Sequence, residues 1–312
     1  MAETLSSAVA GTPNGPQAVP TVAPPRPGAP TVPRVAKPIG RWGWTVVWAV
    51  FSVFTLLPVY WLAVVALRRR VDLMGNYTMW PTSLSLENIR AVVTSDTFVR
   101  YLSNSVVVAS CNAALSTVVA IGAAYALSRF RLPGRDNIFF WLLTNRMAPV
   151  AAFLLPVYLL FTRVFTFGDW SLLDTRLGLI LLYTVFNVPF AVWMLQGMID
   201  AIPEELDEAA FVDGGGTIRV LWSVILPILK PGLAVTVIFT WIFAWNEFLF
   251  ASRLTAVEAR TIPTALAEYV GVTGTNWGEL AALALVTMAP GAVLVGFLQR
   301  HIIAGLTAGA VK

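Results

Sequence analysis

The sequence predicts an all-α membrane protein with six transmembrane helices. The 312 residues are 57% hydrophobic and only 12% charged, whereas soluble domains carry about 25% charged residues. The apolar residues gather in six runs that are too long to be strands of a transmembrane barrel. Since a segment in lipid must satisfy its own backbone hydrogen bonds, we expect each run to be a helix.

Composition also excludes several classes of function. The net charge of +4 comes without a clustered basic run interleaved with aromatic residues, so we expect no nucleic-acid partner. The single cysteine, Cys111, cannot form an intrachain disulfide. The single histidine, His301, and the lack of a Cys/His cluster argue against a zinc site and a histidine-based triad. We therefore expect no catalytic residue and no metal ligand.

The N-terminal stretch differs from the rest of the chain. Residues 1–40 hold nine of the 20 prolines, which predicts a disordered, partly extended tail. The stretch is too long and too rich in proline to be a cleavable signal peptide. We assign residues 1–41 to a cytoplasmic tail and residues 42–312 to the membrane domain.

The first predicted span covers residues 44–67 and contains no charged residue. At about 1.5 Å per residue it crosses a hydrocarbon core of about 30 Å. Aromatic side chains near both ends are suited to the membrane interfaces: Trp42, Trp44, Trp48, Tyr60 and Trp61. Arg68, Arg69 and Arg70 end the span, and a polar segment continues to Arg100.

The next three spans follow the same reasoning. The second covers residues 101–127 and the fourth residues 177–198. The third, residues 138–161, is interrupted by Asn145 and Arg146, and we expect Pro149 and Pro156 to kink it. The fifth covers residues 232–250 and contains Glu247. Residues 251–278 have few long apolar runs, and the sixth span covers residues 280–298.

The loop between spans four and five, residues 202–231, is a polar island. Six of the 17 acidic residues lie within it or just before it: Asp200, Glu204, Glu205, Asp207, Glu208 and Asp213. Pro203 and the glutamates that follow are suited to the start of a helix. Gly214, Gly215 and Gly216 can end that helix and turn the chain. A second short helix is expected from an N-cap at Thr217, and Pro227 and Pro231 are expected to break it before span five.

The glycines are not a phosphate-binding loop, because no Gly-Lys-Ser/Thr follows them. Instead, the loop matches the pattern EAA-x3-G-x9-I-x-L-P, with Val224 in place of the first isoleucine. The match consists of Glu208-Ala209-Ala210, then Gly214 after three residues, then the segment 224–227 after nine more. The small alanines would let a partner approach the backbone closely. This pattern resembles the coupling-helix loop of permease subunits in binding-protein-dependent ABC importers.

Three further segments, residues 123–130, 245–248 and 305–312, resemble the carbohydrate-uptake branch of that family. Within this branch, residues 42–312 are similar to the smaller permease of the maltose system and its relatives. The resemblance implies a heteromeric importer with a second homologous permease subunit, two ABC ATPase subunits and an extracytoplasmic solute-binding protein. ATP and Mg²⁺ would then be bound by the ATPase, and this chain would bind no cofactor and would not itself be an enzyme.

The resemblance also implies a role for the loop. Its helix would lie in a cleft of one ATPase, with Glu208 facing a basic group there. The residues expected to take part in this coupling are Glu204, Glu205, Asp207, Glu208, Ala209, Ala210, Asp213 and Gly214. The protein would be a multi-pass protein of the bacterial inner (plasma) membrane, surrounded by lipid, with both termini in the cytoplasm. Charge alone favours this orientation only weakly, since 11 basic residues would lie inside and nine outside.

Polar residues inside the spans are candidates for the substrate path. A cation in a span usually faces a cavity or a partner, so Arg146, with Asn145, has either a role in the path or its gate or a structural role. Glu247, beside Trp245 and Asn246, is better suited to a helix end or a subunit contact than to sugar binding.

Asn187 precedes Pro189 and could bind sugar hydroxyls, but we favour its satisfying the backbone groups that the proline frees. The cargo could be an oligosaccharide, a polyol or a glycoside.

Two other functions fit the sequence less well. An ion-coupled secondary transporter would use Arg146 and Glu247 as coupling charges, but it leaves the acidic island unexplained, and no inverted repeat is visible. An intramembrane enzyme is disfavoured because no nucleophile and base, and no set of metal ligands, are recognisable.

Overall fold

The computed structural model describes residues 41–75, 78–80, 83–168, 170–271 and 274–308. The predicted tail, residues 1–41, lies outside these ranges except for its last residue, which begins the first helix. The chain divides into two units, Met1–Phe51 and Ser52–Lys312, and the packing described below belongs to the second.

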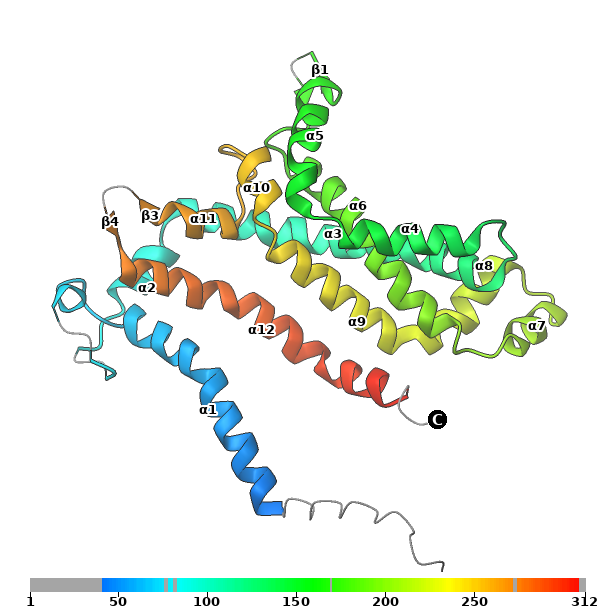
Figure 1. Ribbon diagram of the computed structural model, residues 1–312, viewed down its shortest axis with the longest axis horizontal. Coiled ribbons are helices and arrows are strands. Elements are labelled where there is room, and N and C mark those ends of the chain that lie inside the picture. Colours follow the sequence, from blue (N-terminus) through cyan, green and yellow to red (C-terminus); the bar gives the residue numbers. More distant parts are fainter. Residues whose placement is uncertain (1–40, 76–77, 81–82, 169, 272–273, 309–312) are drawn as a thin grey trace, which may run out of the picture. The chain divides into compact units, whose positions relative to one another are not determined.

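Within the described residues, five segments are helical, long and apolar enough to cross a membrane. They are Trp42–Ala66 in α1 (Arg41–Ala66), α3 (Asp96–Arg129), α6 (Arg176–Ile199), Thr217–Trp245 and Trp277–Phe297 in α12 (Trp277–Ala308) (Figure 1). A sixth span exists if α4 (Arg135–Met147) and α5 (Val150–Arg163) are counted together. The predicted helical membrane fold is therefore confirmed, with five spans or six.

The third predicted span is not one kinked helix. α4 and α5 meet at an angle of 94°. Ala148 is extended, as expected before a proline, and Pro149 is the N-cap of α5. Pro156, in contrast, lies inside α5. The chain thus turns sharply at Pro149, where the sequence predicted only a bend.

The predicted break before span five is also wrong. Residues 217–245 run on as α8 (Thr217–Val220), a π-helical turn η2 (Leu221–Ile225) and α9 (Leu226–Trp245). Pro227 lies in the first turn of α9, where its missing N–H is tolerated, and Pro231 lies inside the helix. A wider π turn is one way in which a helix accommodates such a local defect without ending.

α3 lies at the centre of the packing, against α6 and α9, and α12 packs against α9. The buried residues of α3 recur with helical spacing and are mostly small or polar, for example Asn104, Ser105, Ala109, Asn112, Ala113, Ser116, Ala120 and Ala124. Small side chains allow two helix backbones to approach closely, and polar ones can bond across the interface. Gly232 serves the same purpose in α9, since a Cβ there would lie 2.0 Å from Sδ of Met198 on α6.

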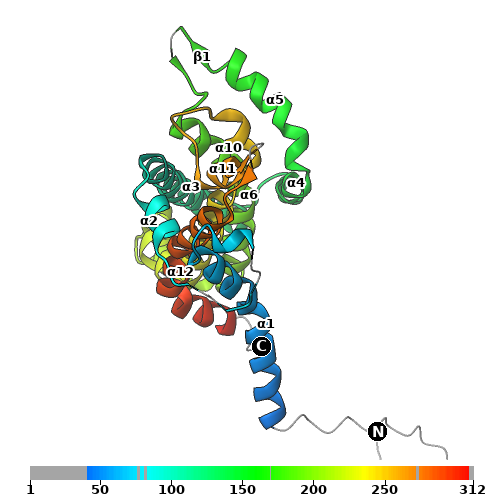
Figure 2. The same cartoon turned by 90° about the vertical axis from the view of Figure 1, so that its left-hand side faces the viewer.

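Short elements connect the long helices. They are η1 (Asp72–Met74), α2 (Glu87–Val93), α10 (Leu249–Leu254), α11 (Ile262–Glu268) and two antiparallel pairs, β1 (Thr166–Phe167) with β2 (Trp170–Ser171) and β3 (Val270–Gly271) with β4 (Gly274–Thr275). α10 packs against α5 and α6, and α11 packs against α3 and α12 (Figure 2).

Arg68, just after α1, is buried. Its guanidinium donates to the hydroxyl of Thr78 at 2.8 Å and to the carbonyl of Trp80 at 2.9 Å. The charge is therefore paired within the loop that follows α1.

A clamp of side chains holds the backbone between α10 and α11. Asp174 accepts four hydrogen bonds, from the backbone N–H groups of residues 256–259, at 2.9–3.1 Å. Asn104 donates to the carbonyls of Glu258 and Arg260 at 2.8 and 2.7 Å and accepts from Arg176 at 2.7 Å. Burial alone would raise the pKa of Asp174, but the four N–H donors outweigh it and hold the pKa below its ordinary value of 3.8.

Candidate functional site

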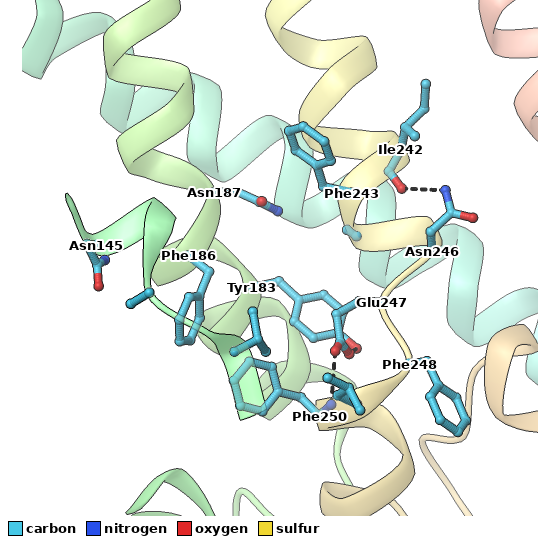
Figure 3. A pocket seen from close by; sticks show the side chains of 14 residues that line it. Asn145, Tyr183, Phe186, Asn187, Ile242, Phe243, Asn246, Glu247, Phe248 and Phe250 are labelled. Carbon is cyan, nitrogen blue, oxygen red and sulfur yellow. Dashed lines mark hydrogen bonds between the residues drawn. The ribbon is translucent and has the colours of Figure 1, made fainter. Parts of the chain in front are cut away.

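A cavity of about 380 Å³ lies among α4, α6 and the junction of α9 with α10 (Figure 3). Its lining includes four of the residues predicted for a substrate path, Asn145, Asn187, Asn246 and Glu247. Aromatic rings complete much of the wall: Tyr183, Phe186, Phe243, Phe248 and Phe250. The side chain of Arg146 lies outside the described part of the chain.

Glu247 lies at the break between α9 and α10, beside Tyr183 of α6 (Figure 3). One carboxylate oxygen accepts from the backbone N–H of Phe250 at 2.9 Å. The other accepts from the N–H of Ala251 at 3.1 Å and from the hydroxyl of Tyr183 at 2.8 Å. The carboxylate therefore caps the start of α10, where a negative charge is favourable. Its hydrogen bond with Tyr183 also links α10 to α6.

Asn187 joins α6 to α3. Its amide donates to the side-chain oxygen of Asn112 at 2.8 Å, and Asn112 donates to the hydroxyl of Thr184 at 3.1 Å. All three side chains are buried. The favoured expectation was that Asn187 bonds the backbone near Pro189, whereas the structure places its amide in this contact between helices.

Trp245 does not line the cavity. Its ring stacks on that of Trp241 with centroids 4.7 Å apart, in the buried core beside α3. Trp241 also donates to the hydroxyl of Ser110 at 3.2 Å. Trp245 therefore faces the core, while the next two residues lie beyond the end of α9 and line the cavity. Its predicted place in a substrate path stays a prediction. Asn246 bonds the carbonyl of Ile242 at 2.9 Å and ends α9.

The lining of the cavity combines amide groups, a carboxylate and aromatic faces. Amides both donate to and accept from hydroxyl groups. Aromatic rings offer apolar faces, and pockets for small molecules usually pair such faces with a few placed polar groups. A polyhydroxylated solute that has both polar edges and less polar faces fits this chemistry.

The polar island forms the second candidate site, at the C-terminal end of α3. α7 (Glu205–Val212) presents an outer surface that is both acidic and apolar. The exposed acidic residues are Glu204, Glu205, Glu208 and Asp213, and the exposed apolar residues nearby are Leu206, Phe211, Val212, Ile218 and Trp222. Ala209 is also exposed, and Ala210 is half-buried. Such an exposed apolar patch is typical of a surface that binds another protein.

Two glycines determine where α7 ends. Gly214 has a φ of 80°, which a residue with a side chain rarely adopts. The N–H of Gly215 then donates to the carbonyl of Ala210 at 2.9 Å, in the manner of a Schellman cap. A Cβ on Gly215 would lie 2.7 Å from that same carbonyl oxygen. The predicted turn at the glycines is thus explained by the local geometry.

Asp207 differs from the other acidic residues of the loop, because only 4% of it is exposed. Its carboxylate pairs with Nε of Arg129 at 2.9 Å and accepts from the hydroxyl of Tyr125 at 3.1 Å. Arg129 also donates to the carbonyl of Ile202 at 2.9 Å. Asp207 therefore faces α3 and not the outer surface of α7, and its predicted part in the coupling stays a prediction. No spacing within the loop could have identified an arginine 78 residues earlier as its partner.

The comparisons with known proteins agree on one family. Residues 116–307 match the family of the binding-protein-dependent transport system inner membrane component. The chain is 34% identical over 259 residues to the diacetylchitobiose uptake system permease protein DasC of Streptomyces coelicolor, which covers 82% of this chain and 92% of DasC. It is 33% identical over 272 residues to the trehalose transport system permease protein SugB of Mycobacterium tuberculosis, which covers 85% of this chain and 97% of SugB.

A solved structure shares the fold. A chain of a bacterial ABC transporter involved in the import of the acidic polysaccharide alginate aligns with a TM-score of 0.71. The alignment covers 83% of this chain and 94% of that one, at 19% sequence identity.

Proposed function

Since the chain belongs to the family of binding-protein-dependent transport system inner membrane components, we propose that it is the permease subunit of an ATP-driven importer of a sugar or a sugar-like solute. The similarity to DasC and SugB over most of their length supports this function, because their names refer to uptake of a disaccharide derivative and of a disaccharide. The composition of the cavity, with amides and aromatic rings, is suited to such a solute. The ion-coupled alternative has no such support.

The proposal includes the rest of the importer. A second permease subunit completes the membrane pathway, two ATPase subunits bind ATP and Mg²⁺, and an extracytoplasmic protein delivers the solute. The protein lies in the inner (plasma) membrane of a bacterium, with both termini and α7 on the cytoplasmic side. ATP hydrolysis takes place on the ATPase subunits, and this chain contributes the passage.

The acidic and apolar outer surface of α7 is the observation that carries the docking role. Glu208 and Phe211 are exposed on it, and burying them in a cleft of the ATPase would strengthen an ion pair that contributes little in water. Ala209 and Gly214 allow the partner to approach closely. Movement of the ATPase subunits then displaces α7, and the spans change between inward-facing and outward-facing arrangements.

In the membrane, we assign the substrate path to the wall of the cavity. In this proposal Asn145, Asn187 and Asn246 contact hydroxyl groups of the solute. Arg146 remains a predicted member of the path or its gate. Glu247 acts there mainly by holding α10 against α6, because three donors already occupy its oxygens.

The test is co-purification in detergent with candidate ABC ATPases. Glu208→Lys should abolish association with the ATPase while the permease still accumulates. Glu87→Lys is the matched control, because it makes the same change at an exposed glutamate of α2, at the opposite end of α3. Uptake of labelled trehalose and diacetylchitobiose by the assembled complex then tests the cargo. If the wild-type chain binds no ATPase and uptake follows an ion gradient, the proposed function is wrong.

A further inference from the structure

The contact of Asp207 with α3 is a buried ion pair with an additional hydrogen bond. Both side chains of the ion pair are nearly inaccessible, at 8% for Arg129 and 6% for Asp207. Both carboxylate oxygens have a partner, since Tyr125 bonds one and Arg129 the other. Opening such a contact would leave a charge buried without its partner, which is strongly unfavourable. α7 and the end of α3 are therefore expected to stay together when either one moves.

The ion pair between Arg135 and Asp200 provides a comparison at the same end of the bundle. Its atoms are 3.6 Å apart, and its side chains are 40% and 42% exposed. Water can replace this contact at little cost, so it contributes little to holding the loop. The buried pair therefore contributes more than the exposed one to holding α7 against the spans.

α3 has a second polar contact on the way to the cavity. Asn112 of α3 accepts from Asn187, which lines the cavity. Along the helix, Asn112 and Tyr125 are about 20 Å apart. α3 is a helix of 34 residues without a proline, whereas α6 and α12 each contain one proline and α9 contains two. It is thus the span that is best suited to move without bending.

From these contacts we propose that the Asp207–Arg129–Tyr125 contact joins α7 and α3 into one rigid body, which transmits displacement of the loop to the wall of the cavity. Asp207 is then a positioning residue of the transport cycle and makes no contact with the ATPase itself. The inference rests on the proposed function, because it is the ATPase that displaces α7.

The experiment follows the movement of α3 itself. Cys111 is the only cysteine of the chain, it is exposed, and it lies beside Asn112 on α3. A nitroxide attached to Cys111, in a complex whose other subunits contain no cysteine, reports the state of α3 with no need for a known cargo. Spectra are recorded with and without MgATP, and co-purification measures how much ATPase is bound.

In the wild type, MgATP should shift the balance between two spectral components. Asp207→Asn should keep the ATPase bound but reduce that shift. The factor by which MgATP changes the equilibrium constant between the two components should be about five to 150 times smaller than in the wild type. Asp200→Asn is the matched control, since it makes the same change in the exposed pair, and it should behave as the wild type does. Asp207→Glu, which restores the charge, should recover most of the shift.

Each outcome decides between the alternatives. Loss of ATPase binding in Asp207→Asn would make Asp207 a docking contact, and an undiminished shift would remove its role in transmission; either result overturns the inference. If Asp207→Asn does not accumulate, Tyr125→Phe takes its place, because it removes one hydrogen bond and leaves the ion pair. A smaller shift in Tyr125→Phe supports the inference, and an unchanged one overturns it. A wild-type chain that binds no ATPase would instead refute the proposed function.

Discussion

The clamp formed by Asp174 allows a prediction whose size follows from its hydrogen bonds. Asp174→Asn leaves one carbonyl oxygen to accept and turns an NH₂ group toward the backbone donors of residues 256–259. Hydrogen bonds to a charged group contribute about 1.5–3 kcal/mol each when shielded from water. Since this loop lies at the surface, we reduce the total for the lost bonds to about 1–3 kcal/mol.

Hydrogen exchange of the backbone N–H groups of residues 256–259 is the measurement. A loss of about 1–3 kcal/mol should speed their exchange about five- to 150-fold. Exchange in α7, at the other end of α3, should not change. Asp136→Asn is the control, because Asp136 is exposed at the start of α4. Equal exchange in wild type and Asp174→Asn would refute the clamp.

The backbone of Asp174 allows a second comparison. Its φ of 54° is tolerated by aspartate and asparagine. Asp174→Asn therefore tests the hydrogen bonds alone. Asp174→Ala adds backbone strain, so the N–H groups of residues 256–259 should exchange faster still in that variant. If the two variants exchange at equal rates, strain contributes nothing at this position.

The clamp should also depend on pH, with a definite sign. Because the pKa of Asp174 is lower in the folded chain than its ordinary value of 3.8, its stabilisation is complete above about pH 4. It is lost as the pH falls through the lowered pKa. After correction for the intrinsic rate of exchange, protection of residues 256–259 should decrease in that range in the wild type and not in Asp174→Asn.

Three further predictions concern helix contacts. Gly232→Ala should lower stability by about 1–3 kcal/mol in thermal unfolding, because its Cβ would displace the side chain of Met198. Glu247→Leu should cost about 2–4 kcal/mol, since three donors lose their acceptor, and Tyr183→Phe only about 1 kcal/mol, by the same measurement. Gly214→Ala should cost about 1 kcal/mol and loosen the end of α7, seen as faster exchange in residues 205–212.

Matched controls exist for two of these changes. A Cβ on Gly197 of α6 would meet no atom within 4 Å, so Gly197→Ala should leave stability unchanged or raise it. Gly216 has a φ of −81°, and a Cβ there would also meet no atom within 4 Å. If Gly216→Ala disturbs α7 as much as Gly214→Ala does, the left-handed conformation is not the cause.

The long helices could be predicted closely because lipid demands long apolar runs. α3, α6 and α12 begin within about five residues of the predicted spans, and the glycine turn after α7 follows from residue chemistry. The proline effects could not be predicted as well. Pro149 ends one helix and starts another at 94°, whereas the helix continues past Pro227, which follows the π turn, and past Pro231 inside α9. The same residue type has either outcome, depending on how the neighbouring helices pack.

The cavity could be predicted only in part. Asn145, Asn187, Asn246 and Glu247 were identified because polar residues in apolar runs are costly and therefore need a reason. Which side of a helix faces the cavity depends on tertiary packing, so the sequence could not show that Trp245 faces the core instead. Partners that are distant in sequence, such as Tyr183 for Glu247 or Arg129 for Asp207, have no signal in a single sequence.

The clamp between α10 and α11 has a consequence for how this surface can evolve or be redesigned. From residues 256–260, Asp174 and Asn104 bind only main-chain atoms, so these contacts do not depend on which side chains that segment carries. Ala256, Val257 and Glu258 are exposed, and any residue except proline can supply the N–H groups that the clamp requires. Residues 256–258 can therefore be substituted one at a time while their backbone stays in place.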